Sequence, residues 1–281
     1  MTSNNKYLIY KGSGGLAHNL RGLSRAIDYC NRTKRKLVID MHRHSGFGVN
    51  YFRIFLNNNK LSWYDSYDII PPTLKYKGYT LDQLAKAPFG LSKHGYTLSG
   101  NVISVLDFNN RDDIVIYAGS GSSTVPINRN IQINGDIVKM LKNEQPINDK
   151  YISVHFRNTD KSNNIGLFIK KIDQLIRNTK INTLYLASDY YEAYDILKKK
   201  FNQLNIVRKT IPPKGIHNLH YGSKDKFKQI YDSIVDIYYI AQSSYFIPSI
   251  NSGYSLLIIG LINGNNSLIP NIKSRTIIVN I

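Results

Sequence analysis

The segment that most clearly indicates a functional site is a strand-like stretch that ends abruptly in polar and charged residues. Residues 152–156 are Ile-Ser-Val-His-Phe, and residues 157–161 are Arg-Asn-Thr-Asp-Lys. This pattern predicts a buried strand whose carboxyl end carries polar side chains, which is where open α/β sheets bind ligands. Because a guanidinium offers forked donors that match phosphate oxygens, we expect Arg157 to hold a diphosphate. His155 lies on the same face of the strand as Arg157, and Asp160 follows three residues after Arg157, so both are further candidates. The alternative is that His155 is an ordinary core histidine and that Arg157 pairs with Asp160 on the surface.

Two further predicted strands in the C-terminal half also end in polar residues. The strand 183–187 is followed by Ser188 and Asp189, which either cap the next helix or hold a ribose or base. The strand 245–247 is followed by hydroxyl, amide and backbone groups that could bind phosphate at the positive end of a helix. These groups belong to Ser249, Asn251 and Ser252. Three polar strand ends at one edge of a sheet predict a single ligand site.

The N-terminal half contains a glycine-rich turn between a predicted strand and a predicted helix. The amides of Gly14 and Gly15 could receive a phosphate or sugar oxygen, and a tight turn without a ligand is the alternative. The turn lacks the later glycine of the dinucleotide-binding fingerprint. Asp40 ends the next predicted strand and is a further candidate.

Alternating strands and helices would bring these candidates together. Apolar residues at helical spacing between the strands 7–10 and 36–40 predict a βαβ unit and a parallel sheet. The chain is then irregular until a strand at 114–117. Alternation resumes with strands at 151–155, 183–187, 205–207 and 245–247, and with helices at about 165–177, 192–201, 225–243 and after residue 251.

A polar segment that contains Pro146 separates the two halves of the chain. We therefore expect an N-terminal domain over residues 1–145 and a C-terminal domain over residues 146–281. Each would be a Rossmann-like α/β unit with a parallel sheet, and a cleft would lie between the two.

The composition indicates a globular protein with a large excess of positive charge. The chain has 281 residues, 42% of them hydrophobic, and a formal net charge of +18. This charge favours anionic ligands and makes nucleic acid a rival partner. However, the tight basic clusters, at 32–36 and 198–200, end predicted helices, where cations complement the helix dipole. Charge alone therefore does not indicate a nucleic-acid-binding protein.

The remaining compositional features concern location and metals. The only cysteine, Cys30, excludes an internal disulfide and a cysteine-based zinc cluster, and it fits a reducing compartment. No stretch has the pattern of a signal peptide or a membrane-spanning helix. No Asp-x-Asp motif is present to hold a divalent ion on a sugar diphosphate. We expect a cytoplasmic protein without a membrane anchor, a metal or a bound cofactor.

The segment 155–161, His-Phe-Arg-Asn-Thr-Asp-Lys, resembles the His-x-Arg-Arg-Thr-Asp-Lys motif of one fucosyltransferase family. This family forms α1,6, α1,2 and protein-O-linked fucose and includes the nodulation fucosyltransferases. Other segments agree in the same order. They are the glycine-rich loop, helix and strand of residues 14–40, the Leu-Ala-Ser-Asp segment 186–189, and residues 236–252 with their aspartate-bearing helix and serine-rich loop.

The resemblance implies a GT-B architecture of two Rossmann-like domains, with GDP-fucose bound mainly by the C-terminal one. By motif position, Arg157 would contact the diphosphate, and His155 and Asp189 would lie in the nucleotide pocket. Ser249 and Ser252 would face the phosphates or the sugar. The resemblance also implies inversion at the anomeric carbon without an essential metal, so that positive groups must stabilise the departing GDP.

The chain departs from the family pattern in the opening loop around residues 17–19, where the asparagine or glutamine of the α1,2 branch is replaced, and at two further positions. Asn158 replaces the second arginine of the motif, which removes a positive charge beside the leaving group. Ile165 occupies the position of a glutamate that is a favoured base in the α1,6 branch. The resemblance therefore does not assign the base. The local candidates for deprotonating an acceptor hydroxyl are Asp40, His42, His44 and Asp160.

These observations favour a glycosyltransferase that moves fucose from GDP-fucose to a hydroxyl of a glycan acceptor. The first alternative is a non-catalytic nucleotide-sugar or glycan-binding protein on the same fold, motivated by Asn158 and the unassigned base. The second is a nucleic-acid-binding protein, which rests on the net charge alone.

Overall fold

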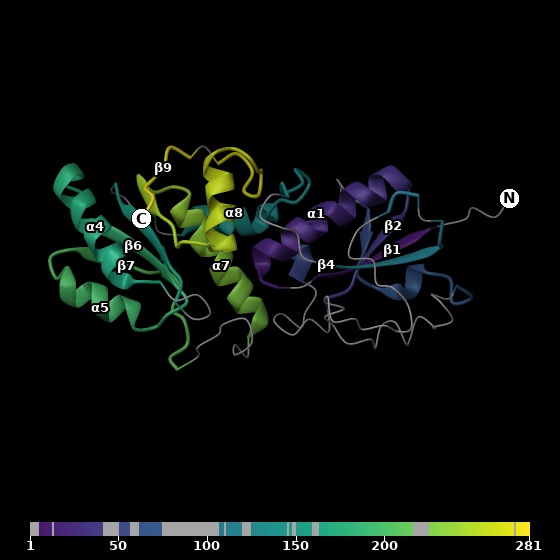
Figure 1. Cartoon of the computed structure of the whole chain (residues 1–281), viewed down its shortest axis with the longest axis horizontal. Coiled ribbons are helices and arrows are strands. Elements are labelled where there is room, and N and C mark those ends of the chain that lie inside the picture. The colour runs from purple at the N-terminus through teal and green to yellow at the C-terminus, as the bar shows by residue number, and fades with distance from the viewer. Residues whose placement is uncertain are drawn as a thin grey trace. The chain divides into compact units, whose positions relative to one another are not determined.

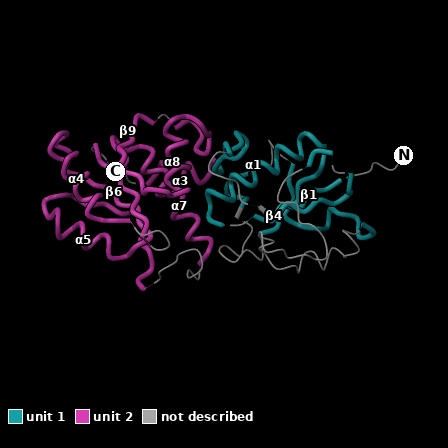
Figure 2. Tube along the Cα trace, in the orientation of Figure 1, with its two compact units in different colours: residues 1–134 teal, residues 135–281 magenta. Residues whose placement is uncertain are grey.

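The computed structural model divides the chain into two compact units. It describes residues 6–12, 14–41, 51–56, 62–74, 107–109, 111–119, 125–144, 146–147, 150–158, 163–215, 225–272 and 274–281. Unit 1 is Met1–Asn134 and unit 2 is Gly135–Ile281 (Figure 2). Each unit contains a parallel sheet with helices, so the predicted α/β class is confirmed.

Unit 1 is built on a four-stranded parallel sheet in the order β3-β2-β1-β4 (Figure 1). Its elements are β1 (Tyr7–Gly12), α1 (Leu16–Thr33), β2 (Lys36–Ile39), the 3-10 helix η1 (Tyr51–Ile54), β3 (Trp63–Tyr64), the 3-10 helix η2 (Tyr67–Ile69) and β4 (Ile114–Gly119). The predicted βαβ unit is confirmed, because β1 pairs in parallel with β2 across α1.

Strand β1 lies at the centre of this sheet, and all six of its residues are buried. Helix α1 ends where Lys34 adopts a left-handed conformation, with φ 59°, and donates its N–H to the carbonyl of Cys30. This C-cap turns the chain directly into β2. The glycine-rich turn and Asp40 consequently lie at the carboxyl ends of adjacent strands.

Unit 2 is built on a five-stranded parallel sheet in the order β7-β6-β5-β8-β9. Its strands are β5 (Ile152–Phe156), β6 (Thr183–Ser188), β7 (Asn205–Val207), β8 (Tyr245–Ile247) and β9 (Ile277–Ile278). Its helices are α3 (Gly135–Asn143), α4 (Ile165–Thr179), α5 (Ala193–Lys200), α7 (Lys226–Ile240) and α8 (Gly253–Ile262). None of the described helices is both long enough and apolar enough to cross a membrane.

The strand order of unit 2 decides where the polar strand ends lie. Strand β5 is flanked by β6 on one side and by β8 on the other, and all five of its residues are buried. In the register, Phe156 lies opposite Ser188 of β6, and Val154 lies opposite Ile247 of β8. The three polar strand ends therefore meet at one edge of the sheet, as the sequence predicts.

Five of the described elements were not predicted, namely η1, β3, η2, α3 and β9. The two edge strands contain two residues each, which is too short for an alternating pattern. Helix α3 belongs to unit 2, and the division between the units lies before it, whereas the boundary expected from sequence lies after it.

Candidate functional site

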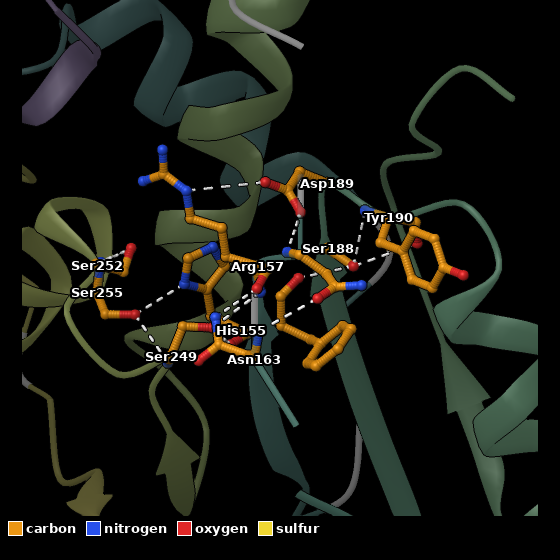
Figure 3. A network of polar contacts seen from close by, with 11 residues as sticks. His155, Arg157, Asn163, Ser188, Asp189, Tyr190, Ser249, Ser252 and Ser255 are labelled. Carbon is orange, nitrogen blue, oxygen red and sulfur yellow. Dashed lines mark hydrogen bonds and ion pairs between the residues drawn. The ribbon is translucent and has the colours of Figure 1, made fainter. Parts of the chain in front are cut away.

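Arg157 directly follows β5, and Ser249 anchors its backbone. The Arg157 N–H donates to the Ser249 hydroxyl at 2.8 Å, and this hydroxyl donates to the carbonyl of His155 at 2.7 Å (Figure 3). Ser249 is buried. One side chain therefore ties the end of β5 to the segment that precedes α8.

The guanidinium of Arg157 lies beside the carboxylate of Asp189. Nε of Arg157 is 3.9 Å from Oδ2 of Asp189, and each side chain is 16% exposed. The other carboxylate oxygen accepts the N–H of Asn158 at 2.8 Å. Figure 3 shows the two terminal nitrogens of Arg157 on the side of the guanidinium away from Asp189. Asp189 therefore lies on the Nε side of the guanidinium, and the two terminal nitrogens lie on the other side.

Ser188 joins the ends of β5 and β6. Its hydroxyl donates to the carbonyl of Phe156 at 2.7 Å and accepts the N–H of Tyr190 at 3.0 Å. Glu192, not this Ser–Asp pair, is the N-cap of α5, so the helix-capping alternative is wrong. Ser188 thus holds the strand ends together, and Asp189 is the member of the pair that faces Arg157.

His155 is buried next to this network. Its Nδ1 is 2.7 Å from the hydroxyl of Ser255, and its ring centroid is 4.9 Å from that of Tyr254. Burial, with a smaller contribution from the charge of Arg157, lowers the pKa of His155 to about 3. The ring is consequently neutral at physiological pH, where it supports the strand end without adding positive charge.

Serine hydroxyls bind backbone N–H groups in the segment that precedes α8, at the same edge of the sheet. The Ser252 hydroxyl caps the helix by accepting the N–H of Ser255 at 3.3 Å, and the Ser255 hydroxyl accepts the N–H of Ser249 at 3.1 Å. Asn251 is exposed and adopts a left-handed conformation with φ 55°. The amino terminus of α8, the positive end of the helix dipole, thus lies beside the residues that anchor Arg157.

Two residues of this network have no role in the predictions from sequence. Asn163 donates its N–H to the side-chain oxygen of Asn158 at 3.2 Å and its amide to the carbonyl of Arg157. Asn158, the position that differs from the family motif, therefore binds the residue that precedes the N-cap of α4. Ser255, the second residue, is a buried hydroxyl in the otherwise apolar run 255–259, which is a signal available from the sequence.

In unit 1, the glycine-rich turn is held by Asn19. The Asn19 amide donates to the carbonyls of Gly14 at 2.7 Å and Gly15 at 3.1 Å. Gly14 has φ 78°, a conformation that side chains disfavour, and Gly15 is the N-cap of α1 without a side-chain cap. Helix α1 thus begins at a glycine that provides no capping side chain.

Asp40 is buried in an ion pair. Oδ2 of Asp40 is 2.7 Å from Nζ of Lys11 and accepts the hydroxyl of Tyr67 at 2.6 Å. Burial and the charge of Asp40 raise the pKa of Tyr67 well above its usual value, so the phenol stays protonated and donates. The other candidates for the base, Asp160, His42 and His44, lie outside the described residues.

A buried carboxylate that sequence reasoning did not single out lies on α7. Asp236 accepts the hydroxyl of Tyr185 at 2.7 Å and the hydroxyl of Thr210 at 3.0 and 3.1 Å. Burial raises the pKa of Asp236 to about 7, although both hydrogen bonds favour the charged form. The signal in the sequence is a lone acid within the apolar run 234–240.

His155 and Asp236 should give the free energy of unfolding opposite dependences on pH. Between about pH 3 and 6.5 the unfolded chain binds a proton at His155 that the folded chain does not, so stability rises with pH. Between about pH 3.8 and 7 the folded chain keeps a proton on Asp236 that the unfolded chain has lost, so stability falls as pH rises.

The variant Asp236→Asn separates the two contributions. We expect its free energy of unfolding, from urea titrations, to rise more steeply between about pH 4 and 6.5 than that of the wild type. Asp173→Asn, which removes a half-exposed carboxylate on α4, should leave the slope unchanged. Parallel curves for wild type and Asp236→Asn would contradict a protonated Asp236 in the folded state.

The described residues include no group of three or more histidine, cysteine, aspartate or glutamate side chains placed to hold a metal ion. What unit 2 offers is a forked cation, the amino terminus of a helix and a carboxylate that orients the cation. This combination suits a diphosphate, because charge-assisted hydrogen bonds from a guanidinium and from backbone amides match its oxygens.

The fold resembles solved fucosyltransferases. The fucosyltransferase NodZ from Bradyrhizobium is 16% identical, with a TM-score of 0.55, and the match covers 92% of this chain and 94% of that one. The NodZ α1,6-fucosyltransferase soaked with GDP-fucose is 17% identical, with a TM-score of 0.52 and coverage of 89% and 91%. POFUT1 in complex with GDP is 11% identical, with a TM-score of 0.60 and coverage of 100% of both chains.

No protein-family model and no curated protein matches the sequence. The structural neighbours confirm the resemblance to fucosyltransferases that the motifs indicate, and at these identities they establish the fold.

Proposed function

We propose that this protein is a glycosyltransferase that moves fucose from GDP-fucose to a hydroxyl group of a glycan acceptor, with inversion and without an essential metal. The observation that carries the proposal is Arg157, which extends from the central strand of unit 2 and is oriented by Asp189 and Ser249. The fold shared with fucosyltransferases solved with GDP or GDP-fucose supports it.

Unit 2 would bind the donor. Arg157 would contact the diphosphate, and the segment 249–252 at the amino terminus of α8 would face its remaining oxygens. Asp189 would hold Arg157 in place, and the neutral ring of His155 would support the strand end beneath it. During transfer the bond from fucose C1 to the phosphate oxygen breaks, and Arg157 would stabilise the charge that develops on GDP.

Unit 1 would contribute to the acceptor side, with the architecture of a two-domain GT-B enzyme. The amides of Gly14 and Gly15 would contact a phosphate or sugar oxygen. An acceptor hydroxyl attacks C1 from the face opposite GDP and must lose its proton, for which Asp40 and Asp160 are the candidate bases. Asp40 forms an ion pair with Lys11 at 2.7 Å, so a base role for Asp40 would need this pair to separate.

A second candidate is a non-catalytic protein that binds a nucleotide sugar or a glycan on the same fold. The observation that favours it is the use of the Asn158 side chain to close the loop after β5, where the family motif carries a second cation. Binding of GDP-fucose without transfer or hydrolysis would support this candidate.

The experiment is to incubate the protein with GDP-fucose, GDP-mannose, UDP-glucose and UDP-N-acetylglucosamine and a panel of oligosaccharides. Donor affinity is measured by calorimetry, and release of the nucleotide is measured with a coupled assay, with and without EDTA. We expect selective binding and turnover of GDP-fucose that EDTA does not abolish. Lack of GDP-fucose binding would refute the donor assignment, and loss of turnover with EDTA would refute metal independence.

A further inference from the structure

A second group of side chains lies at the same edge of the unit 2 sheet. Tyr191 lies in the turn after β6, Tyr194 in the first turn of α5, and Arg208 directly after β7; Lys214 follows in the same loop. Because β6 and β7 are parallel neighbours, these segments leave the sheet at one edge. We call these four residues the tyrosine–arginine cluster.

Aromatic rings hold the two cations of the cluster. The guanidinium carbon of Arg208 lies 4.1 Å from the ring centroid of Tyr194 and 5.9 Å from that of Tyr191. Nζ of Lys214 lies 5.9 Å from the centroid of Tyr191. Tyr194 is half-buried and packs against the core of unit 2, so its ring is a firm support. A guanidinium that contacts a ring through its face keeps its in-plane N–H groups for an oxyanion.

The cluster has an excess of positive charge. Within the described part of the chain, neither Arg208 nor Lys214 forms an ion pair with a carboxylate, although Glu192 and Asp195 flank the two tyrosines in sequence. Two cations near the ring of Tyr191 repel each other. An anion bound close to both would offset this repulsion.

The position of the cluster indicates which anion it would bind. Arg157 leaves β5, whereas Arg208 leaves β7, two strands away, which is roughly 10 Å at the usual spacing between strands. The charge of GDP-fucose is concentrated on its two linked phosphates, which Arg157 and α8 would hold on the opposite side of β5. The charge at β7 is therefore not needed for the diphosphate of the donor and is available to another anionic group.

We propose that the tyrosine–arginine cluster binds a carboxylate or phosphate group carried by the acceptor, so that the acceptor is an acidic oligosaccharide. This assignment rests on the proposed function, because it takes the neighbouring strand ends as the donor site. Arg208 would bind the oxyanion through its forked N–H groups, and the nearby Lys214 would add positive charge.

The test compares neutral oligosaccharides with uronate-bearing and phosphate-bearing counterparts on a glycan array, without donor. We expect wild type to bind the acidic members at least about tenfold more tightly, and Arg208→Gln and Tyr194→Leu to lose about tenfold on those members only. Arg208→Lys should lose less. The control Lys199→Gln removes one exposed charge from the last turn of α5 and should change little. GDP-fucose affinity, measured separately, should stay within about twofold in every variant.

Three results would overturn the proposal. These are equal binding of neutral and acidic glycans by wild type, equal losses in Arg208→Gln and Lys199→Gln, and Arg208-dependent binding of inorganic phosphate with no preference among glycans. Arg208-dependent binding of acidic glycans by a protein that does not bind GDP-fucose would support the anion site and refute only the proposed donor.

Discussion

Replacement of Arg157 by alanine should weaken the binding of GDP and GDP-fucose by about two orders of magnitude while unit 2 remains folded. The expected loss is about 3 kcal/mol, because charge-assisted hydrogen bonds from a guanidinium to a diphosphate are lost together. The fold should survive, since Ser249 binds the backbone of residue 157, and the side-chain contact with Asp189 spans 3.9 Å. Calorimetric titration with GDP measures the affinity.

Two control variants test whether the loss of affinity depends on the forked donors of the Arg157 guanidinium. Arg157→Lys keeps the charge but not the bidentate geometry, and it should fall between wild type and alanine. Arg177→Ala removes an exposed arginine of α4 that pairs with Asp173, and it should bind GDP normally. Thermal unfolding checks that each variant is folded. Undiminished GDP affinity in folded Arg157→Ala would disprove the assignment of the diphosphate anchor.

Replacement of Asp40 by asparagine should lower the free energy of unfolding by about 3 kcal/mol. The reason is that the buried Lys11 would lose the carboxylate that lies 2.7 Å from its Nζ. Chemical denaturation monitored by circular dichroism measures the loss. Tyr67→Phe removes only the hydrogen bond from the phenol to the Asp40 carboxylate and should cost about 2 kcal/mol, the usual range for a hydrogen bond to a charged group.

A double-mutant cycle tests the ion pair itself. Lys11→Met combined with Asp40→Asn should be less destabilising than the sum of the single variants, because no buried charge then lacks a partner. Additive effects would contradict a stabilising interaction between the two side chains. If the folded fraction of Asp40→Asn turns over GDP-fucose at the wild-type rate, the base cannot be Asp40, and Asp160 becomes the remaining carboxylate candidate.

The strands and helices that carry the site were predictable because their signals are local. In the buried strand β5, apolar residues alternate with Ser153 and His155, and α1 shows apolar residues at helical spacing. The candidate residues at the ends of β5, β6 and β8 followed from these assignments, since the carboxyl ends of parallel strands share an edge. The short strands β3 and β9 were missed because two residues carry no periodicity.

The partners of the site residues could not be predicted in this way. Ser255 lies 100 positions from His155, and Ser249 lies 92 positions from Arg157, yet these pairs form hydrogen bonds of 2.7 and 2.8 Å. Asp236 likewise pairs with a tyrosine 51 positions away. Such contacts depend on the strand order and on the packing of α7 and α8, which no local pattern encodes.

The α/β class, the main strands and the arginine that follows β5 could be predicted from short segments, because burial periodicity and residue chemistry are local properties. The orientation of that arginine, the contact of Asn158 with Asn163 and the pairing of Asp40 with Lys11 became evident only in the folded protein. Hydrogen bonds and ion pairs require atoms within a few ångströms, and packing alone brings distant parts of a chain that close.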